Sequence, residues 1–211
     1  MIEVKINEYD RVLLARMTLV IAISLLGGLS VGIAYAQFSN DQIGSLAQQQ
    51  GEWSLYQNVT YGVSILYPFN WTQQNSTGDA DDRFIYVSDF SSPEETNGYF
   101  ALVTIAIDSM PNTTNIESYR NQSIDIYRQD PELQEFQVLT SSIGNFTLAG
   151  MPAYSFEIIY TDLEFGPQNM LEVGTIFDDR VYYIQYYADT PIYQKYLPIA
   201  ERMIESFQIM Q

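Results

Sequence analysis

From residue 53 onward, short runs of alternating apolar and polar residues are separated by turn residues, a pattern typical of β-strands. In residues 154–160, aromatic or apolar side chains occupy every second position, and Ser155 and Glu157 fall between them. The pattern predicts strands over residues 55–60, 63–67, 84–90, 100–108, 136–143, 146–148, 154–161, 170–177 and 181–187. Because short turns join neighbouring strands, we expect antiparallel pairing, with one packed and one wetter face.

Two other segments repeat apolar residues every three or four positions, which predicts helices. The first spans residues 116–129 and ends at Asp130 before a proline. The second opens at Thr190, an expected N-cap, with Pro191 at the first helical position. Pro198 lies inside this second helix and removes a backbone hydrogen bond, so we expect a kink or a helix in two pieces.

An uncharged segment of twenty residues, 17–36, follows Arg11 and Arg16 near the N-terminus. It closes with Ala34-Tyr35-Ala36, which matches the cleavage pattern of a secretory signal peptide. Twenty apolar residues are also enough to cross a hydrocarbon core of about 30 Å. The segment is therefore a predicted signal peptide or, if it is retained, a membrane anchor.

These features divide the chain into three parts. Residues 1–36 are the predicted signal peptide or membrane anchor, residues 37–51 form a polar, glutamine-rich linker, and residues 52–211 form one folded domain. Because Arg11 and Arg16 are expected to remain on the cytoplasmic side of the membrane, the domain is expected to be extracytoplasmic. It is then either secreted or anchored to the outer face of the cytoplasmic membrane.

The amino-acid composition excludes several kinds of functional site and one class of partner. The chain has no Cys and no His, which excludes disulfides, histidine-based nucleophilic sites and Cys- or His-ligated zinc. Its formal net charge is −17, with 9 basic residues against 26 acidic ones. Because nucleic-acid binding depends on clustered basic residues, we expect no nucleic-acid partner.

The run Tyr61-Gly62-Val63-Ser64-Ile65-Leu66-Tyr67-Pro68-Phe69-Asn70-Trp71 resembles the opening motif of the PsbP family. The closing segment, residues 196–209, resembles the last helix of that family and the short Ser-Phe strand after it. The resemblance covers about residues 53–210. It implies an α+β fold, an α/β/α sandwich with a central antiparallel sheet, in which Trp71 packs the core.

The resemblance also implies a function, because the PsbP family consists chiefly of binding and assembly modules. We therefore expect a non-catalytic binding or accessory module, not an enzyme, acting at the cell surface on a protein partner or an envelope component. The chain departs from the plant photosystem subunit of this family in lacking His and in having Lys195 as its only Lys after residue 5. A carboxylate-dependent glycan hydrolase and a calcium-binding adhesion or accessory subunit remain as alternatives.

Calcium is the one cofactor that the sequence suggests. Asp79, Asp81 and Asp82 cluster in one predicted loop and supply the oxygen ligands that Ca²⁺ prefers. Their spacing matches no EF-hand loop, and a solvated acidic loop is the competing interpretation.

Two further kinds of site are predicted. Six Asn-x-Ser/Thr sequons are present, and Asn75 and Asn112 lie in predicted loops, which makes them the expected glycosylation sites. The aromatic strand near residue 185 carries Tyr183 and Tyr187, which are candidates for an exposed partner-binding patch or for packing. Among the strand carboxylates, Glu157 and Glu172 are expected to be exposed on the polar faces of their strands.

Overall fold

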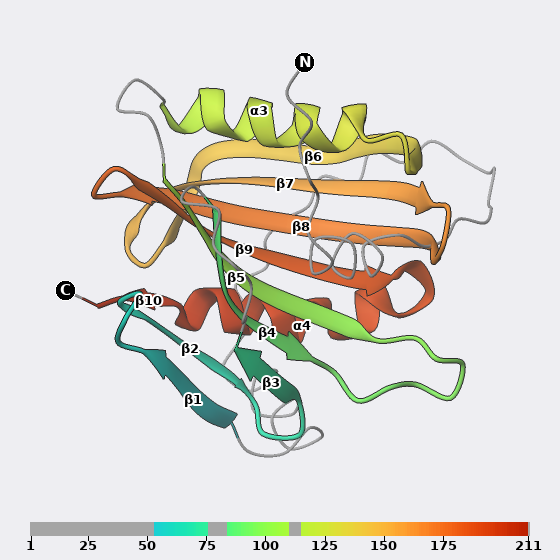
Figure 1. Ribbon diagram of the computed structural model, residues 1–211, viewed down its shortest axis with the longest axis horizontal. Coiled ribbons are helices and arrows are strands. Elements are labelled where there is room, and N and C mark those ends of the chain that lie inside the picture. Colours follow the sequence, from blue (N-terminus) through green and yellow to red (C-terminus); the bar gives the residue numbers. More distant parts are fainter. Residues whose placement is uncertain (1–52, 76–83, 110–114, 211) are drawn as a thin grey trace.

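The computed structural model describes residues 53–75, 84–109 and 115–210, which form two antiparallel sheets and two helices (Figure 1). The predicted leader at residues 1–36 and the linker at residues 37–51 lie outside this described part. Within it, neither helix is both long enough and apolar enough to span a membrane.

The larger sheet has seven strands in the order β3-β4-β5-β9-β8-β7-β6. Their bounds are β3 (Thr72–Asn75), β4 (Phe84–Ser91), β5 (Ala101–Ser109), β6 (Leu133–Leu148), β7 (Met151–Asp162), β8 (Gly166–Phe177) and β9 (Arg180–Asp189). Every neighbouring pair is antiparallel, as the short turns predict. Between β8 and β9, Asp178 and Asp179 both adopt positive φ, the conformation of a tight two-residue hairpin turn, so the hairpin predicted here is confirmed.

The smaller sheet has the order β1-β2-β10, with β1 (Trp53–Asn58), β2 (Val63–Pro68) and β10 (Gln208–Ile209). Gly62, in the turn between β1 and β2, has a φ of 63° and faces the end of the chain. Its carbonyl accepts a hydrogen bond of 2.7 Å from the Met210 amide, and a Cβ added at Gly62 would lie 2.9 Å from the Met210 carbonyl oxygen. A glycine here lets the last residues close against the hairpin.

Helix α3 (Ile116–Gln129) begins after Asn115, whose Oδ1 accepts a hydrogen bond of 2.8 Å from the Ser118 amide. Its bounds and its end before Asp130 are as predicted. Helix α4 (Thr190–Ser206) runs without interruption through Pro198, so the expectation of a helix in two pieces is wrong. Its N-cap is Asp189, one residue earlier than predicted, because the Thr190 hydroxyl instead donates to Asn169.

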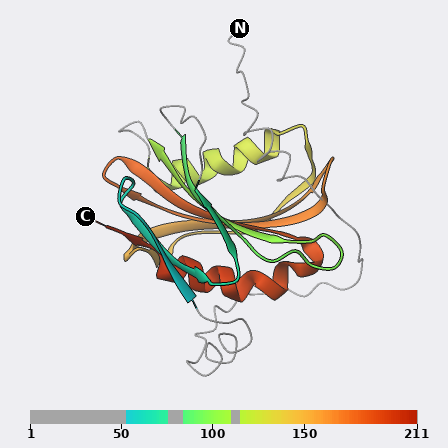
Figure 2. The same cartoon turned by 60° about the horizontal axis from the view of Figure 1, so that its bottom comes forward.

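The two faces of the larger sheet bury separate apolar clusters. On one face, α3 packs over β6 and β7 and covers Tyr154, Phe156 and Ile158. On the other face, α4 packs against β2, β5, β8 and β9, so the larger sheet, α4 and the smaller sheet share one core. Figure 2 shows α4 on the opposite side of the larger sheet from α3.

The predicted α/β/α sandwich with a single central sheet is wrong. Strands take up 59% of the described residues and form two sheets, and these residues contain only two helices. Seven strands spaced about 4.8 Å apart span roughly 30 Å, whereas one helix is about 10 Å wide. A single helix therefore covers only part of each face, and the fold is a β-rich one with antiparallel sheets.

Candidate functional site

Under α3, the larger sheet buries a group of polar side chains that we call the acid–tyrosine cluster. It consists of Asp108, Tyr119, Ser123, Tyr127, Tyr154, Glu172, Gln185 and Tyr187. The antiparallel register assembles the cluster, because Glu172 of β8 lies directly opposite Gln185 of β9 on one side and Phe156 of β7 on the other. The strand members of the cluster therefore project from the sheet face that α3 covers, and Tyr119, Ser123 and Tyr127 reach them from α3.

Glu172 is the centre of this cluster. One carboxylate oxygen accepts hydrogen bonds from the Tyr154 hydroxyl at 2.7 Å and the Ser123 hydroxyl at 2.9 Å. The other oxygen accepts a bond of 2.7 Å from the Gln185 amide. Burial raises the pKa of Glu172, and the three donors oppose that rise.

The rest of the cluster links α3 to three strands. The Gln185 amide also donates to the Tyr127 hydroxyl at 2.6 Å, and the Tyr187 hydroxyl donates to Gln185 Oε1 at 2.5 Å. From the start of α3, the Tyr119 hydroxyl donates to Asp108 at 3.0 Å. Because the members satisfy one another, the arrangement fastens α3 to β5, β8 and β9.

Two expectations about this face are corrected. Glu172 is 1% exposed, so its predicted place on a solvated strand face is wrong. Tyr183 and Tyr187 are also buried, so the structure does not support an exposed partner-binding patch at these two tyrosines. The physical reason is the same for all three, since α3 crosses the face that carries them and supplies hydroxyl partners to its polar groups.

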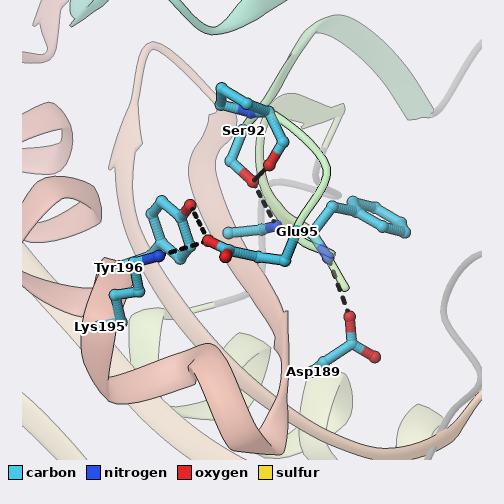
Figure 3. A network of polar contacts seen from close by, with 8 residues as sticks. Ser92, Glu95, Asp189, Lys195 and Tyr196 are labelled. Atoms are coloured by element: carbon cyan, nitrogen blue, oxygen red, sulfur yellow. Dashed lines mark hydrogen bonds and ion pairs between the residues drawn. The ribbon is translucent and has the colours of Figure 1, made fainter. Parts of the chain in front are cut away.

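A second polar network joins the segment between β4 and β5 to the start of α4 (Figure 3). The Glu95 carboxylate forms an ion pair with Lys195 and accepts a hydrogen bond of 2.5 Å from the Tyr196 hydroxyl. These two donors, Lys195 first, lower the pKa of Glu95. Asp189 accepts a bond of 3.1 Å from the Phe100 amide, so the segment is held at a second point, directly before β5.

This network includes Lys195, which is the one lysine among the described residues. Glu95 lies in the connection between β4 and β5, and its carboxylate is bound to α4. Lys195 also lies 5.0 Å from the ring centroid of Tyr196, and Trp71 packs edge-on against that ring at 5.9 Å. Trp71 is buried, in the core role predicted for it.

The smaller sheet offers a different kind of surface. Residues 53–75 contain no charged side chain, although the whole chain has a net charge of −17. Three large apolar side chains of this segment are exposed: Leu55 by 57%, Val59 by 87% and Phe69 by 64%. We call this uncharged segment with its three exposed apolar residues the small-sheet surface.

Among the described residues, β2 is the only strand that pairs with β1, so one edge of the smaller sheet has no described strand beside it. Sheet edges are normally protected by charges, by proline, by bulges or by being very short. The edges of the larger sheet follow that rule: β3 has four polar residues, and β6 has three register shifts and a positive φ at Glu135. Strand β1 has regular pairing and none of these protections.

The other predicted sites are placed only in part. Asp79, Asp81, Asp82 and Asn112 lie outside the described residues, and calcium binding therefore stays a prediction. Asn75 is exposed at the end of β3, where its Oδ1 accepts hydrogen bonds from Tyr56 and Gln73. Within the described residues, no group of three or more acidic side chains is arranged to hold a metal ion.

Sequence reasoning missed the small-sheet surface as a candidate site. The signal was present in the sequence, because residues 53–75 form an uncharged segment in a strongly acidic chain. The apolar residues of this segment were interpreted only as core residues, since the alternating pattern of a strand does not reveal which of them stay exposed to solvent. The acid–tyrosine cluster had no comparable signal, because it depends on how β5, β8, β9 and α3 come together.

No known family model and no curated protein matches the sequence. Solved structures do match: the cyanobacterial PsbP protein CyanoP of Synechocystis is 14% identical, with a TM-score of 0.54, covering 88% of this chain and 98% of CyanoP. LpqN of Mycobacterium tuberculosis, described as involved in cell envelope biogenesis, is 13% identical, with a TM-score of 0.52, covering 80% of this chain and 97% of LpqN. The fold of this chain is therefore PsbP-like.

Proposed function

We propose that this protein is a non-catalytic binding or accessory module that acts outside the cytoplasm on a protein partner or an envelope component. The observation that carries the proposal is the small-sheet surface. An acidic protein gains nothing in solubility from a segment that has no charged side chain and exposes Leu55, Val59 and Phe69, and exposed apolar surface typically marks contact sites. The edge of β1 that no described strand pairs with adds backbone donors and acceptors to the same segment.

Two features support the non-catalytic part of the proposal. The buried carboxylate of Glu172 is engaged by three donors of the protein itself. Glu95 is likewise engaged by Lys195 and Tyr196. A general acid or base must instead reach the substrate, so these two carboxylates serve the fold.

The extracytoplasmic part rests on the predicted leader at residues 17–36. The part that LpqN plays in cell envelope biogenesis is consistent with such a location, although a shared fold does not by itself transfer a role.

Charge insertion tests the proposal. Leu55→Asp combined with Val59→Asp adds two negative charges to the small-sheet surface, and both side chains already face solvent, so the fold should persist. The matched control is Leu163→Asp in the turn between β7 and β8, where Leu163 is 64% exposed. Each tagged protein is cross-linked in its native envelope and captured, and the captured components are quantified.

The proposal predicts one reproducible component that the wild type and the Leu163→Asp control recover equally. The double variant should recover it at least tenfold less, because each buried apolar contact replaced by a charge costs on the order of 1 kcal/mol or more. Equal recovery by the double variant, or no reproducible component with the wild type, would contradict the proposal. Circular dichroism melting verifies that the variants are folded.

A further inference from the structure

The sequons of this chain differ in how the fold presents them. Each consists of an asparagine, whose side-chain amide would carry the sugar, and a Ser or Thr hydroxyl two residues later. A transferase has to reach both side chains, so their exposure and hydrogen bonds decide whether a sequon is usable. Four of the six sequons lie wholly within the described residues, and they begin at Asn58, Asn70, Asn121 and Asn145.

The sequon at Asn121 does not present its two side chains together. It lies on α3, where residues two apart point about 200° apart around the helix axis. Asn121 is exposed, whereas Ser123 is half-buried and its hydroxyl donates to Glu172 at 2.9 Å. The hydroxyl of this sequon is therefore committed to the interior of the protein.

The sequon at Asn58 is blocked in a different way. Asn58 is half-buried at the end of β1, and its Nδ2 donates to the Tyr56 hydroxyl at 3.1 Å. Its Oδ1 accepts hydrogen bonds from the amides of Thr60 at 3.1 Å and Tyr61 at 3.3 Å, which shapes the turn into β2. A sugar on Nδ2 would displace the bond to Tyr56 and crowd this turn.

The sequon at Asn70 presents both of its side chains to solvent. It runs from the turn after β2 into the start of β3, and Asn70 and Thr72 are both exposed. Trp71 between them is buried, and its amide donates to the Pro68 carbonyl at 2.9 Å, which fixes the turn. Within the described residues, neither Asn70 nor Thr72 uses its side chain in a hydrogen bond.

The sequon at Asn145 has the same arrangement on the larger sheet. Asn145 and Thr147 are exposed on β6, and Phe146 between them packs against the core. The segment lies in the shift of register between Ile143 and Thr147, where Asn145 has no paired residue on β7. Exposure alternates along these three residues, so the asparagine and the threonine are open to an approaching enzyme together.

We propose that Asn70 and Asn145 carry N-linked oligosaccharides and that Asn58 and Asn121 do not. The proposal rests on the extracytoplasmic location in the proposed function, since N-linked sugars belong to exported proteins. In the transfer, the asparagine Nδ2 forms a bond to the anomeric carbon of the first sugar of an oligosaccharide linked to a lipid phosphate. The bond from that carbon to the phosphate oxygen breaks, the lipid phosphate leaves with the electron pair, and the amide proton passes to a base of the transferase.

Neutral sugars at these two positions supply hydration where the chain has no charge. The two longest runs of described residues without a charged side chain are 53–75 and 136–156, and each contains one of the two sites. A sugar on Asn145 also adds bulk beside β6, an edge strand of the larger sheet, and so hinders its pairing with another chain.

A sugar on Asn70 also limits where a partner can contact the small-sheet surface. Asn70 adjoins Phe69, just after Pro68, which pairs with the first residue of β1. Val59 follows the last residue of β1, at the other end of the same hairpin. The sugar therefore covers the Phe69 end and leaves Leu55 and Val59 open to the partner.

Mass spectrometry of the protein purified from its native host tests the proposal. The proteolytic peptides with Asn70 and Asn145 should carry sugar, whereas those with Asn58 and Asn121 should have their unmodified masses. Asn70→Gln and Asn145→Gln should each lower the intact mass by one oligosaccharide, and the matched controls Asn58→Gln and Asn121→Gln should keep all attached sugar.

The hydroxyl of the Asn70 sequon gives a second, independent readout. Thr72→Ala should remove the sugar from Asn70, and Thr72→Ser should keep it, because the motif requires a hydroxyl two residues after the asparagine. Both variants leave Asn70 itself unchanged, and Thr72 is exposed at the start of β3, so the fold should persist. Sugar at Asn70 that survives Thr72→Ala would contradict attachment through the sequon.

Other results would overturn the proposal directly. An unmodified Asn70 or Asn145 peptide would overturn it for that site, and sugar on Asn58 or Asn121 would contradict the exclusion of those two sites. The peptide map of the wild type needs no variant, so it decides the outcome even if a substitution fails to fold. Protease added to intact cells separates the two proposals: an accessible, unmodified domain would contradict this one alone, whereas a protected domain would contradict the proposed location as well.

Discussion

Asp162, the last residue of β7, uses one carboxylate oxygen and leaves the other without a partner. Its Oδ1 accepts hydrogen bonds from the amides of Glu164 at 2.6 Å and Phe165 at 3.3 Å, which closes the turn into β8. Its Oδ2 is buried and has no hydrogen-bond partner within the described residues. Burial raises the pKa of Asp162 from 3.8 to about 6, so ionisation of this group opposes folding.

Asp162→Asn should therefore stabilise the protein at pH 8. The asparagine oxygen keeps the turn, and the unpaired charge is removed, so the free energy of unfolding should rise by about 1 kcal/mol, a value reduced for partial solvent screening. Denaturant titrations at pH 8 and pH 4 measure the difference, which should vanish at pH 4 because the wild-type side chain is then protonated in the folded state. A lower stability of the variant at pH 8 would contradict this account of Asp162.

Gly174 is a second single residue on which the interior depends. A Cβ added there would lie 2.5 Å from Cε1 and 2.6 Å from the hydroxyl oxygen of Tyr154, the ring that donates to Glu172. Gly174→Ala should cost about 1–3 kcal/mol of unfolding free energy, as overpacking of a rigid core does. In a Tyr154→Ala background the same change should be nearly neutral, so an additive double-mutant cycle by chemical denaturation would contradict the assigned clash.

At the scale of elements, pattern and turn chemistry predicted most strands and both helices. Strand β3 was missed because its sequence, Thr-Gln-Gln-Asn, has no apolar residue to reveal it. Strand β6 was predicted as two strands because Gly144 and Asn145 interrupt the alternation. In the structure β6 continues through these two residues, which lie within a shift of its register against β7 between Ile143 and Thr147.

Helix α4 offers a test of how proline is tolerated inside an element. Pro198 lacks the amide that would donate to the Gln194 carbonyl, yet α4 continues past it. Pro198→Ala should restore that bond and raise the unfolding free energy by about 1–3 kcal/mol. The control is Pro191→Ala in the first turn, where no amide partner is lost and the change should be within about 1 kcal/mol of zero. A destabilised Pro198→Ala variant, measured by thermal melting, would show that the proline ring is needed for packing.

For the whole molecule, the sequence predicted antiparallel pairing but not the number of sheets. The pairing of β10 with β2 joins the two ends of the described chain, and no local pattern encodes such a contact. The same limit applies to Glu172, whose burial follows from the position of α3. The lack of charged residues in the segment 53–75 can be recognised without a structure, because it is a property of the sequence alone.

The whole molecule should be more stable in mild acid than at neutral pH. Burial raises the pKa of five carboxyl groups, those of Glu157, Asp162, Glu172, Asp189 and Glu201. A folded-state pKa above the unfolded value means that the ionised form weakens the fold, so stability is highest below the unfolded values near 4 and falls as pH rises through the folded ones. Glu95, with a lowered pKa, acts in the opposite direction but is exposed.

Differential scanning calorimetry at constant ionic strength checks this expectation between pH 4.5 and pH 8. The Tm should fall by several degrees as pH rises, and the largest change should come near pH 6, where Asp162 titrates. A Tm that rises steadily to pH 8 would contradict the role given to the buried carboxylates.

Site-specific photo-cross-linking in the native envelope tests the central claim, contact through the small-sheet surface, most directly. A photoreactive residue placed at Leu55 or at Val59 should give a discrete adduct with the same partner, while one placed at Leu163, which is also exposed, should give none. Adducts of equal yield at all three positions, or none at Leu55 and Val59, would contradict the claim.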